Sequence, residues 1–89
     1  MENLPELVKY FTDKGANLNI QNYNGDTPLH ISARENFDDC TKILLEGKAA
    51  LDIPNNNNQI AFDYFDNMQK KEFGLEKVVI ILKDKKKMN

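Results

Sequence analysis

The sequence predicts an all-α fold in which helix-turn-helix units stack as a solenoid and are connected by short β-hairpin loops. One observation is a repeat at a spacing of 33 residues, which pairs Ala16 with Ala49, Leu18 with Leu51 and Ile20 with Ile53. The other is a helix start at Thr27-Pro28 that follows a turn at Gly25. A period of 20–50 residues is typical of proteins built from stacked units.

The first expected element is an amphipathic helix near the N-terminus. Its apolar positions recur at i, i+3, i+4 and i+7, and they are Leu4, Leu7, Val8 and Phe11. Pro5 is tolerated in a first helical turn, and Gly15 suits a left-handed helix end. By the spacing of 33, this is the outer helix of a partial repeat over residues 2–20. Its apolar stripe lacks an inner helix, so we expect shelter from the next unit, from a partner or from a second copy of the chain.

A full repeat is expected over residues 21–53. Thr27 can cap an inner helix with its hydroxyl, and Pro28 falls at the first helical position, where a missing N–H costs nothing. Leu29, Ile31 and Ala33 give this helix an apolar face, and Ile43, Leu44 and Leu45 do so for an outer helix. The polar stretch Arg34-Glu35-Asn36 separates the two helices.

Thr27-Pro28-Leu29-His30 and the run Ile43-Leu44-Leu45-Glu46 closely resemble the ankyrin repeat. Ala49-Ala50-Leu51-Asp52 is similar to the phrase that ends each unit of that family, and Asn36 stands at its turn glycine. The sequence differs from the family pattern at Gly47-Lys48, where the glycine comes one residue before the expected left-handed position. We therefore expect Lys48 to adopt a positive φ at a cost of about 1 kcal/mol, or the helix to end one residue sooner.

A third, degenerate repeat is expected over residues 54–84, followed by a basic tail at 85–89. It keeps apolar residues at Ile60, Phe62 and Phe65 but lacks the Thr, Pro and His of the full repeat, as terminal capping units do. Its second helix is predicted over 75–83, after an insertion near 68–72 and a turn at Gly74. A buried strand over 78–82 is the weaker alternative. The basic tail suits a solvated helix end, an acidic partner or a nuclear-localisation signal.

The composition and charge of the chain argue against several classes of function. The 89 residues carry a net charge of −2, which gives no electrostatic reason to expect nucleic acid or an anionic membrane as partner. No apolar run is long enough to cross a bilayer, and no signal-peptide pattern opens the chain. The single cysteine, Cys40, excludes an internal disulfide and suits a reducing compartment. We expect a cytoplasmic or nuclear protein.

The sequence contains no recognisable catalytic or cofactor-binding pattern, so we expect a protein that is not an enzyme and needs neither cofactor nor metal. The resemblance places His30 on an inner helix, where the family uses it for structural hydrogen bonds, and Cys40 on an outer helix as a buried residue. The acidic residues near helix starts are expected to favour those starts rather than to bind a cation. They are Asp38, Asp39, Asp63 and Asp66.

What remains is binding. The resemblance implies a concave face formed by the loop tips and the inner helices, which presents a protein or peptide partner with variable side chains. These candidate partner-binding residues are Gln21, Tyr23, Asn24, Asp26, Arg34, Glu35, Asn56 and Gln59. Tyr23 is the strongest, because tyrosine is enriched at interfaces and no packing role is evident for it, although a tyrosine folded back on its loop is the alternative. The alternative function is a slice or end cap of a longer array, with self-association through the exposed N-terminal half-repeat.

Overall fold

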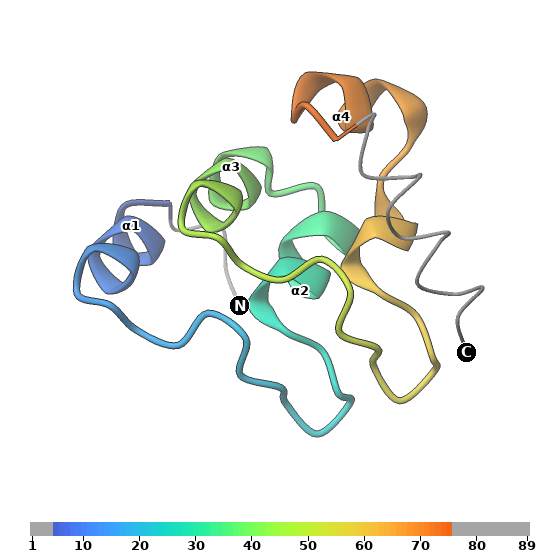
Figure 1. The fold of residues 1–89 in the computed structure, drawn as a ribbon, viewed down its shortest axis with the longest axis horizontal. Coiled ribbons are helices and arrows are strands. Elements are labelled where there is room, and N and C mark those ends of the chain that lie inside the picture. The colour runs from blue at the N-terminus through green and yellow to red at the C-terminus, as the bar shows by residue number, and fades with distance from the viewer. Residues whose placement is uncertain (1–4, 76–89) are drawn as a thin grey trace.

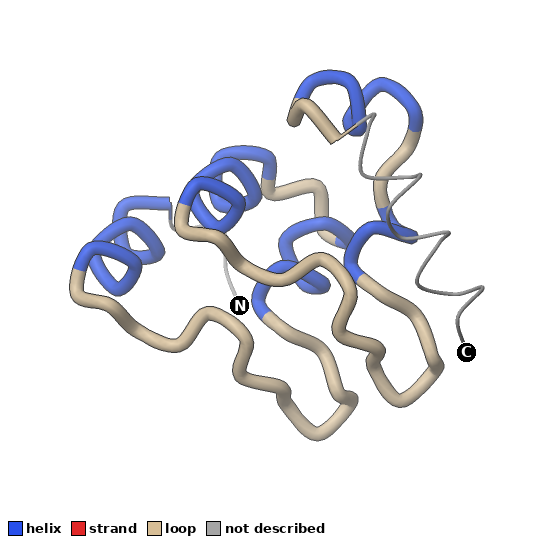
Figure 2. The backbone as a smooth tube through the Cα atoms, in the orientation of Figure 1, coloured by secondary structure: helices blue, strands red, loops and turns tan. Residues whose placement is uncertain are grey.

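The computed structural model describes residues 5–75, and over this range the chain forms two layers of short helices (Figure 1). The elements are α1 (Pro5–Asp13), α2 (Pro28–Arg34), α3 (Asp38–Glu46), the 3-10 helix η1 (Ala61–Tyr64) and α4 (Asn67–Glu72). The outer helices α1 and α3 pack together, and α2 packs on both α3 and η1. Two long loops, at residues 14–27 and 47–60, leave the helices in the same direction (Figure 2). The all-α prediction is confirmed.

The loops contain no β-strand within the described residues, although short β-hairpins were expected. Each loop closes through one backbone bond between its arms, Asn22 N to Asp26 O in the first and Asn55 N to Gln59 O in the second, both 2.9 Å long. A single cross-loop bond is too short a ladder to make a strand pair. The loop conformation depends on side chains instead.

Helix α2 begins as the sequence predicts. Thr27 adopts an extended backbone, and its Oγ1 accepts a hydrogen bond of 3.3 Å from the N–H of His30. The N–H of Thr27 in turn donates to Nδ1 of His30 at 3.0 Å. Pro28 occupies the first turn, where its missing N–H has no helical partner to lose. Thr27 and His30 therefore cap the N-terminus of α2 reciprocally, each side chain accepting a hydrogen bond from the backbone N–H of the other residue.

The core lies between the inner and outer helices of the full repeat and extends to the third unit. Leu29, Leu44 and Ala61 are completely or almost completely buried, and Phe65 is 4% exposed. These residues form one cluster, against which Val8 and Leu18 of the first unit pack from its edge. Cys40 is also buried, as predicted. All three units thus share a single hydrophobic core.

Residues with positive φ end the helices where the repeat requires it. Gly15 (φ 76°) follows α1, Asn36 (φ 60°) follows α2 and Lys48 (φ 68°) follows α3. The expectation of a positive φ at Lys48 is confirmed. Gly47 is required by a close approach, because a Cβ there would lie 2.6 Å from Thr12 Cγ2 on the neighbouring helix α1.

The third unit differs from the expected course. Its inner helix shrinks to the single turn η1, and residues 68–72, where we placed an insertion, belong to helix α4. Asp66 caps α4 by accepting from Gln69 N at 2.7 Å, while Gln69 Oε1 accepts from Asp66 N at 3.0 Å. Gly74 (φ 69°) follows α4. The second helix predicted over 75–83, its strand alternative and the basic tail at 85–89 lie outside the described residues, apart from Leu75.

Candidate partner-binding face

The first loop, defined here as residues 22–26, is held by one asparagine side chain. Asn22 Oδ1 accepts from the backbone N–H groups of Asn24 (2.9 Å) and Asp26 (3.0 Å). Gly25, with φ of 79°, completes the turn, and its N–H donates to Asn22 O at 2.9 Å. Asparagine suits this role because its short amide reaches backbone groups two and four residues ahead.

The second loop, residues 55–59, repeats this geometry. Asn55 Oδ1 accepts from Asn57 N (3.0 Å) and Gln59 N (2.9 Å), and Asn58 takes the left-handed position with φ of 60°. These residues are each 33 positions after their counterparts in the first loop. The repeat therefore extends from the helices to the hydrogen bonds of the loops.

The two loops are hydrogen-bonded to each other at their tips. Asn56 donates its backbone N–H to Asn24 O (2.9 Å) and its side-chain amide to Tyr23 O (2.7 Å). Gln21 Nε2 bridges the loops at their base, donating to Gly25 O (2.9 Å) and Pro54 O (3.1 Å). The loops consequently present one continuous surface.

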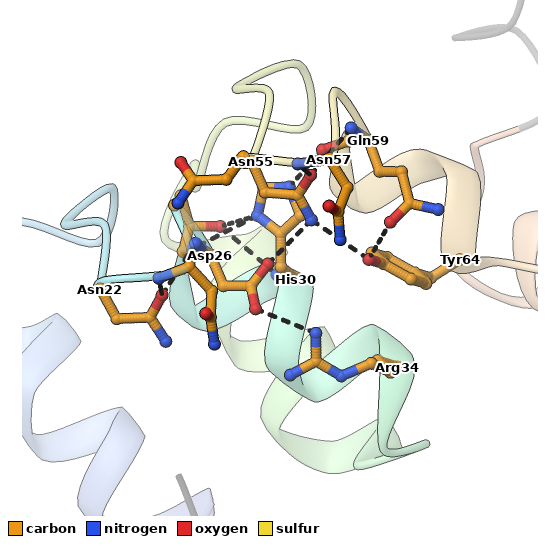
Figure 3. A network of polar contacts seen from close by, with 12 residues as sticks. Asn22, Asp26, His30, Arg34, Asn55, Asn57, Gln59 and Tyr64 are labelled. Atoms are coloured by element: carbon orange, nitrogen blue, oxygen red, sulfur yellow. Dashed lines mark hydrogen bonds and ion pairs between the residues drawn. The ribbon is translucent and has the colours of Figure 1, made fainter.

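Asp26 stands at the centre of this surface and is only 3% exposed (Figure 3). Its Oδ1 accepts from Asn55 Nδ2 and its Oδ2 from Arg34 Nη1, both at 2.9 Å. Burial opposes ionisation, but the hydrogen bonds from Asn55 and Arg34 and the charge of Arg34 outweigh it and lower the pKa of Asp26 below its ordinary value. Asp26 therefore joins both loops to the end of α2 as a carboxylate.

Arg34 and Tyr64 close the face on the helix side. The hydrogen bond to Asp26 raises the pKa of Arg34 above its ordinary value, and the guanidinium lies 5.9 Å from the centre of the Tyr64 ring. Tyr64 donates its hydroxyl to Gln59 Oε1 at 2.8 Å and accepts from Asn55 Nδ2 at 3.2 Å. Glu35 is half exposed and pairs with Arg34 Nε at 3.7 Å, a surface contact worth less than about 1 kcal/mol.

His30 lies beneath the face and has the structural role predicted for it. Its Nδ1 accepts from Thr27 N, so the ring proton resides on Nε2, which donates to Gln59 O at 2.8 Å. The imidazole thus connects the cap of α2 to the second loop. It is 1% exposed and unavailable to a ligand.

A polar pocket of about 270 Å³ opens between the loops and the helices. Its lining residues are Asn24, Asp26, Arg34, Asn55, Asn56, Asn57 and Tyr64. Four of the predicted binding residues therefore meet at one pocket, namely Asn24, Asp26, Arg34 and Asn56. Gln21 does not line this pocket but lines a second, more apolar one with Ile20 and Ile31. Whether any of these residues binds a partner stays a prediction.

Tyr23 is fully exposed at the tip of the first loop, and its only hydrogen bond to another described residue uses the backbone carbonyl. The ring is therefore not folded into its own loop core. Sequence reasoning missed Asn55, Asn57 and Tyr64 as lining residues. The spacing of 33 would have found Asn57 from the candidate Asn24, whereas nothing in the pattern marks Asn55 or Tyr64 as lining residues.

Two kinds of feature are absent from the described residues. From 5 to 75, no three His, Cys, Asp or Glu side chains gather where they could hold a metal ion. No helix in that range is long and apolar enough to cross a membrane. The predicted roles of the acidic residues at helix starts are confirmed: Asp38 and Asp39 occupy the first turn of α3, and Asp63 accepts from Ile60 N at 3.0 Å.

Comparison with known proteins gives consistent results. A family model described as ankyrin repeats (3 copies) matches residues 1–65. The chain is 31% identical over 75 residues to mouse protein phosphatase 1 regulatory subunit 12A, covering 75% of this chain and 7% of that protein. It is 33% identical over 64 residues to protein fem-1 homolog C of Xenopus laevis, covering 72% and 10%. It is 41% identical over 49 residues to ankyrin repeat domain-containing protein 37 of Bos taurus, covering 55% and 31%.

Proposed function

Because this chain belongs to the ankyrin-repeat family, we propose that it is a non-enzymatic interaction module that binds a partner protein or peptide on the face formed by the two loops and α2. Ankyrin repeats generally serve protein interaction, but they share a fold rather than a partner. The relatives are much longer than this chain, which spans 7% of the phosphatase subunit. Their activities and partners are therefore not transferred here.

The observation that carries this proposal is the full exposure of Tyr23 beside a polar pocket. An aromatic ring that packs against no residue from 5 to 75 has apolar area to bury in a complex. The hydrogen bonds of the loops hold the backbone that carries the ring, which lowers the entropic cost of ordering the loop on binding.

Affinity capture from cell extract with matched variants tests the proposal. We expect Tyr23→Ala to lose bound protein, because the variant removes an exposed anchor without touching the loop hydrogen bonds. Tyr10→Ala is the control, since Tyr10 is also an exposed tyrosine, at 56%, but lies on α1 away from the loops. Equal capture by wild type and Tyr23→Ala, or a loss only in Tyr10→Ala, would contradict the assignment of this face.

A second candidate function is favoured by the exposed apolar residues of the first unit. Leu7 and Phe11 are each 48% exposed and Ile20 is 62% exposed. Under this proposal the segment is a slice or end cap of a longer array, and the isolated chain self-associates through α1. Sedimentation velocity distinguishes the two: association that rises with concentration and disappears in Phe11→Asp supports the second, and a monomer at all concentrations contradicts it.

We place the module in the cytoplasm or nucleus, where a reducing environment keeps a buried cysteine as a thiol. We expect neither nucleic acid nor membrane among its partners. Microscopy of a fluorescent fusion that showed secretion or a membrane location would contradict this placement.

A further inference from the structure

Asn24 and Asn57 occupy equivalent positions in the two loops and both line the polar pocket. Each donates its backbone N–H to the asparagine that holds its loop, so its main chain is fixed. Within the described part of the chain, neither side-chain amide has a hydrogen-bond partner. Two exposed amide groups, one for each loop, therefore lie on residues of the same pocket and have unused donors and acceptors.

The charged groups of the pocket are already engaged. Both carboxylate oxygens of Asp26 accept hydrogen bonds, one of them from Arg34, so the single negative charge and the single positive charge of the lining cancel. The other lining residues contribute amides and one phenol. A charged ligand would find no uncompensated opposite charge there, whereas a ligand with both donors and acceptors would match the asparagines.

We propose that this pocket binds an uncharged, extended peptide segment that crosses the two loops, with the side-chain amides of Asn24 and Asn57 pairing to its main-chain N–H and C=O groups. This inference rests on the proposed function of the face and names the kind of partner that it takes. A peptide group is the natural complement of a carboxamide, because each carries one carbonyl acceptor and at least one N–H donor.

The loop tips also lie close together, because Asn56 N donates to Asn24 O at 2.9 Å. An extended peptide advances roughly 3.3 Å for each residue, so one short segment can reach both Asn24 and Asn57. The pocket volume of about 270 Å³ is below the ~300–1,000 Å³ of small-molecule sites, so it accepts one polar side chain between the two paired groups rather than a cofactor.

A phage-displayed library of random 12-residue peptides, selected on the immobilised whole chain, provides the probe. Enriched peptides are synthesised, and their dissociation constants are measured by fluorescence anisotropy for the wild type and for Asn24→Ala and Asn57→Ala. Asn67→Ala is the matched control, because Asn67 is exposed on α4 and lies outside the pocket. Circular dichroism shows whether each variant keeps its helices.

We expect uncharged peptides to be enriched, each pocket variant to weaken binding at least fivefold, and Asn67→Ala to change it less than twofold. We also expect less than a twofold change in affinity between 50 and 500 mM salt, since no ionic contact is screened. No enrichment, a steep salt dependence or unchanged affinity in both pocket variants overturns the inference. If Tyr23→Ala weakens binding and the asparagine variants do not, the amide pairing fails while the proposed face stands; if none of the three matters, both fail.

Discussion

The two loops are nearly identical in hydrogen bonding, whereas the helices that follow them differ. In the full repeat, Thr27 N–H donates to the His30 ring and the Thr27 hydroxyl caps a two-turn helix. In the third unit, Ile60 N–H donates to Asp63, but Ile60 has no hydroxyl and the helix stops after one 3-10 turn. The loop conformation thus depends on an asparagine and a residue with left-handed backbone. A full inner helix depends in addition on the Thr-Pro-Leu-His pattern that follows the loop.

The comparison also separates residues that act within one unit from residues that join units. Among residues 5–75, Asp63 bonds only to its own helix start, whereas His30 reaches Gln59 in the next loop. Within the described range, the exposed Asn22 side chain bonds only to its own loop, whereas its buried counterpart Asn55 also reaches Asp26 and Tyr64. Residues at equivalent positions therefore contribute differently to stability, because some of them also bond to the neighbouring unit.

The largest effect is expected at His30. His30→Ala removes a fully buried ring and its bonds to both repeats, so we expect the free energy of unfolding to fall by about 3 kcal/mol. Asp63 is exposed and lies 33 residues after His30, and Asp63→Ala should lower the free energy of unfolding by about 1 kcal/mol. Urea denaturation measures both. Similar losses would show that the inner helices of the two units do not differ as described.

The next effect distinguishes the two asparagines. Asn55→Ala leaves the buried Asp26 without one of its two donors and should lower the free energy of unfolding by about 2 kcal/mol. Asn22→Ala removes only the two bonds within the first loop and should cost about 1 kcal/mol. The same urea titrations apply, and an equal or larger loss in Asn22→Ala would contradict the coupling of the loops through Asn55.

Asp26 and Gln59 occupy equivalent positions, but only Asp26 titrates. Because its pKa is lowered in the folded state, its contribution to stability is present above the unfolded carboxyl pKa of about 3.9 and is lost as the pH falls from there through the folded value. Asp26→Asn should therefore reduce stability at neutral pH and weaken its decline below pH of about 4. Thermal melts between pH 3 and 7 check this, and parallel curves for the two proteins would refute it.

The smallest effect concerns the left-handed positions after α1 and α3. Gly15 occupies the first of these positions without strain, whereas Lys48 occupies the second at a steric cost. Lys48→Gly should therefore raise the free energy of unfolding by about 1 kcal/mol. Gly47→Ala is the contrasting change and should lower it, because the new Cβ would approach Thr12 and Leu18. Denaturant melts in which Lys48→Gly gives no gain would count against the repeat register.

Sequence reasoning predicted the parts of this fold that local chemistry encodes. The cap at Thr27, the helix end at Gly15 and the strain at Lys48 each follow from a few adjacent residues. Helix α4 was missed because residues 67–72 have no apolar period, although Asp66 and Gln69 form a capping box that could have indicated a helix start. The third inner helix retains its apolar residues, so its shortening to η1 could be inferred only from the missing threonine and proline.

The binding face was predicted less completely, for a physical reason. Loop position alone suggested that Asp26 is available to a partner, yet it is buried by Asn55, which lies 29 residues further along the chain. Such contacts depend on how one repeat unit packs against the next, which the local sequence does not reveal. The exposure of Tyr23 could be predicted without any long-range contact, because no described residue covers its side chain.

Hydrogen–deuterium exchange of the chain with and without a captured partner tests the central claim most directly. If the two hydrogen-bonded loops form one binding face, amide protection should rise together at residues 22–26 and 55–59 when the partner binds. Protection confined to α1 and α3, with both loops unchanged, would contradict the account.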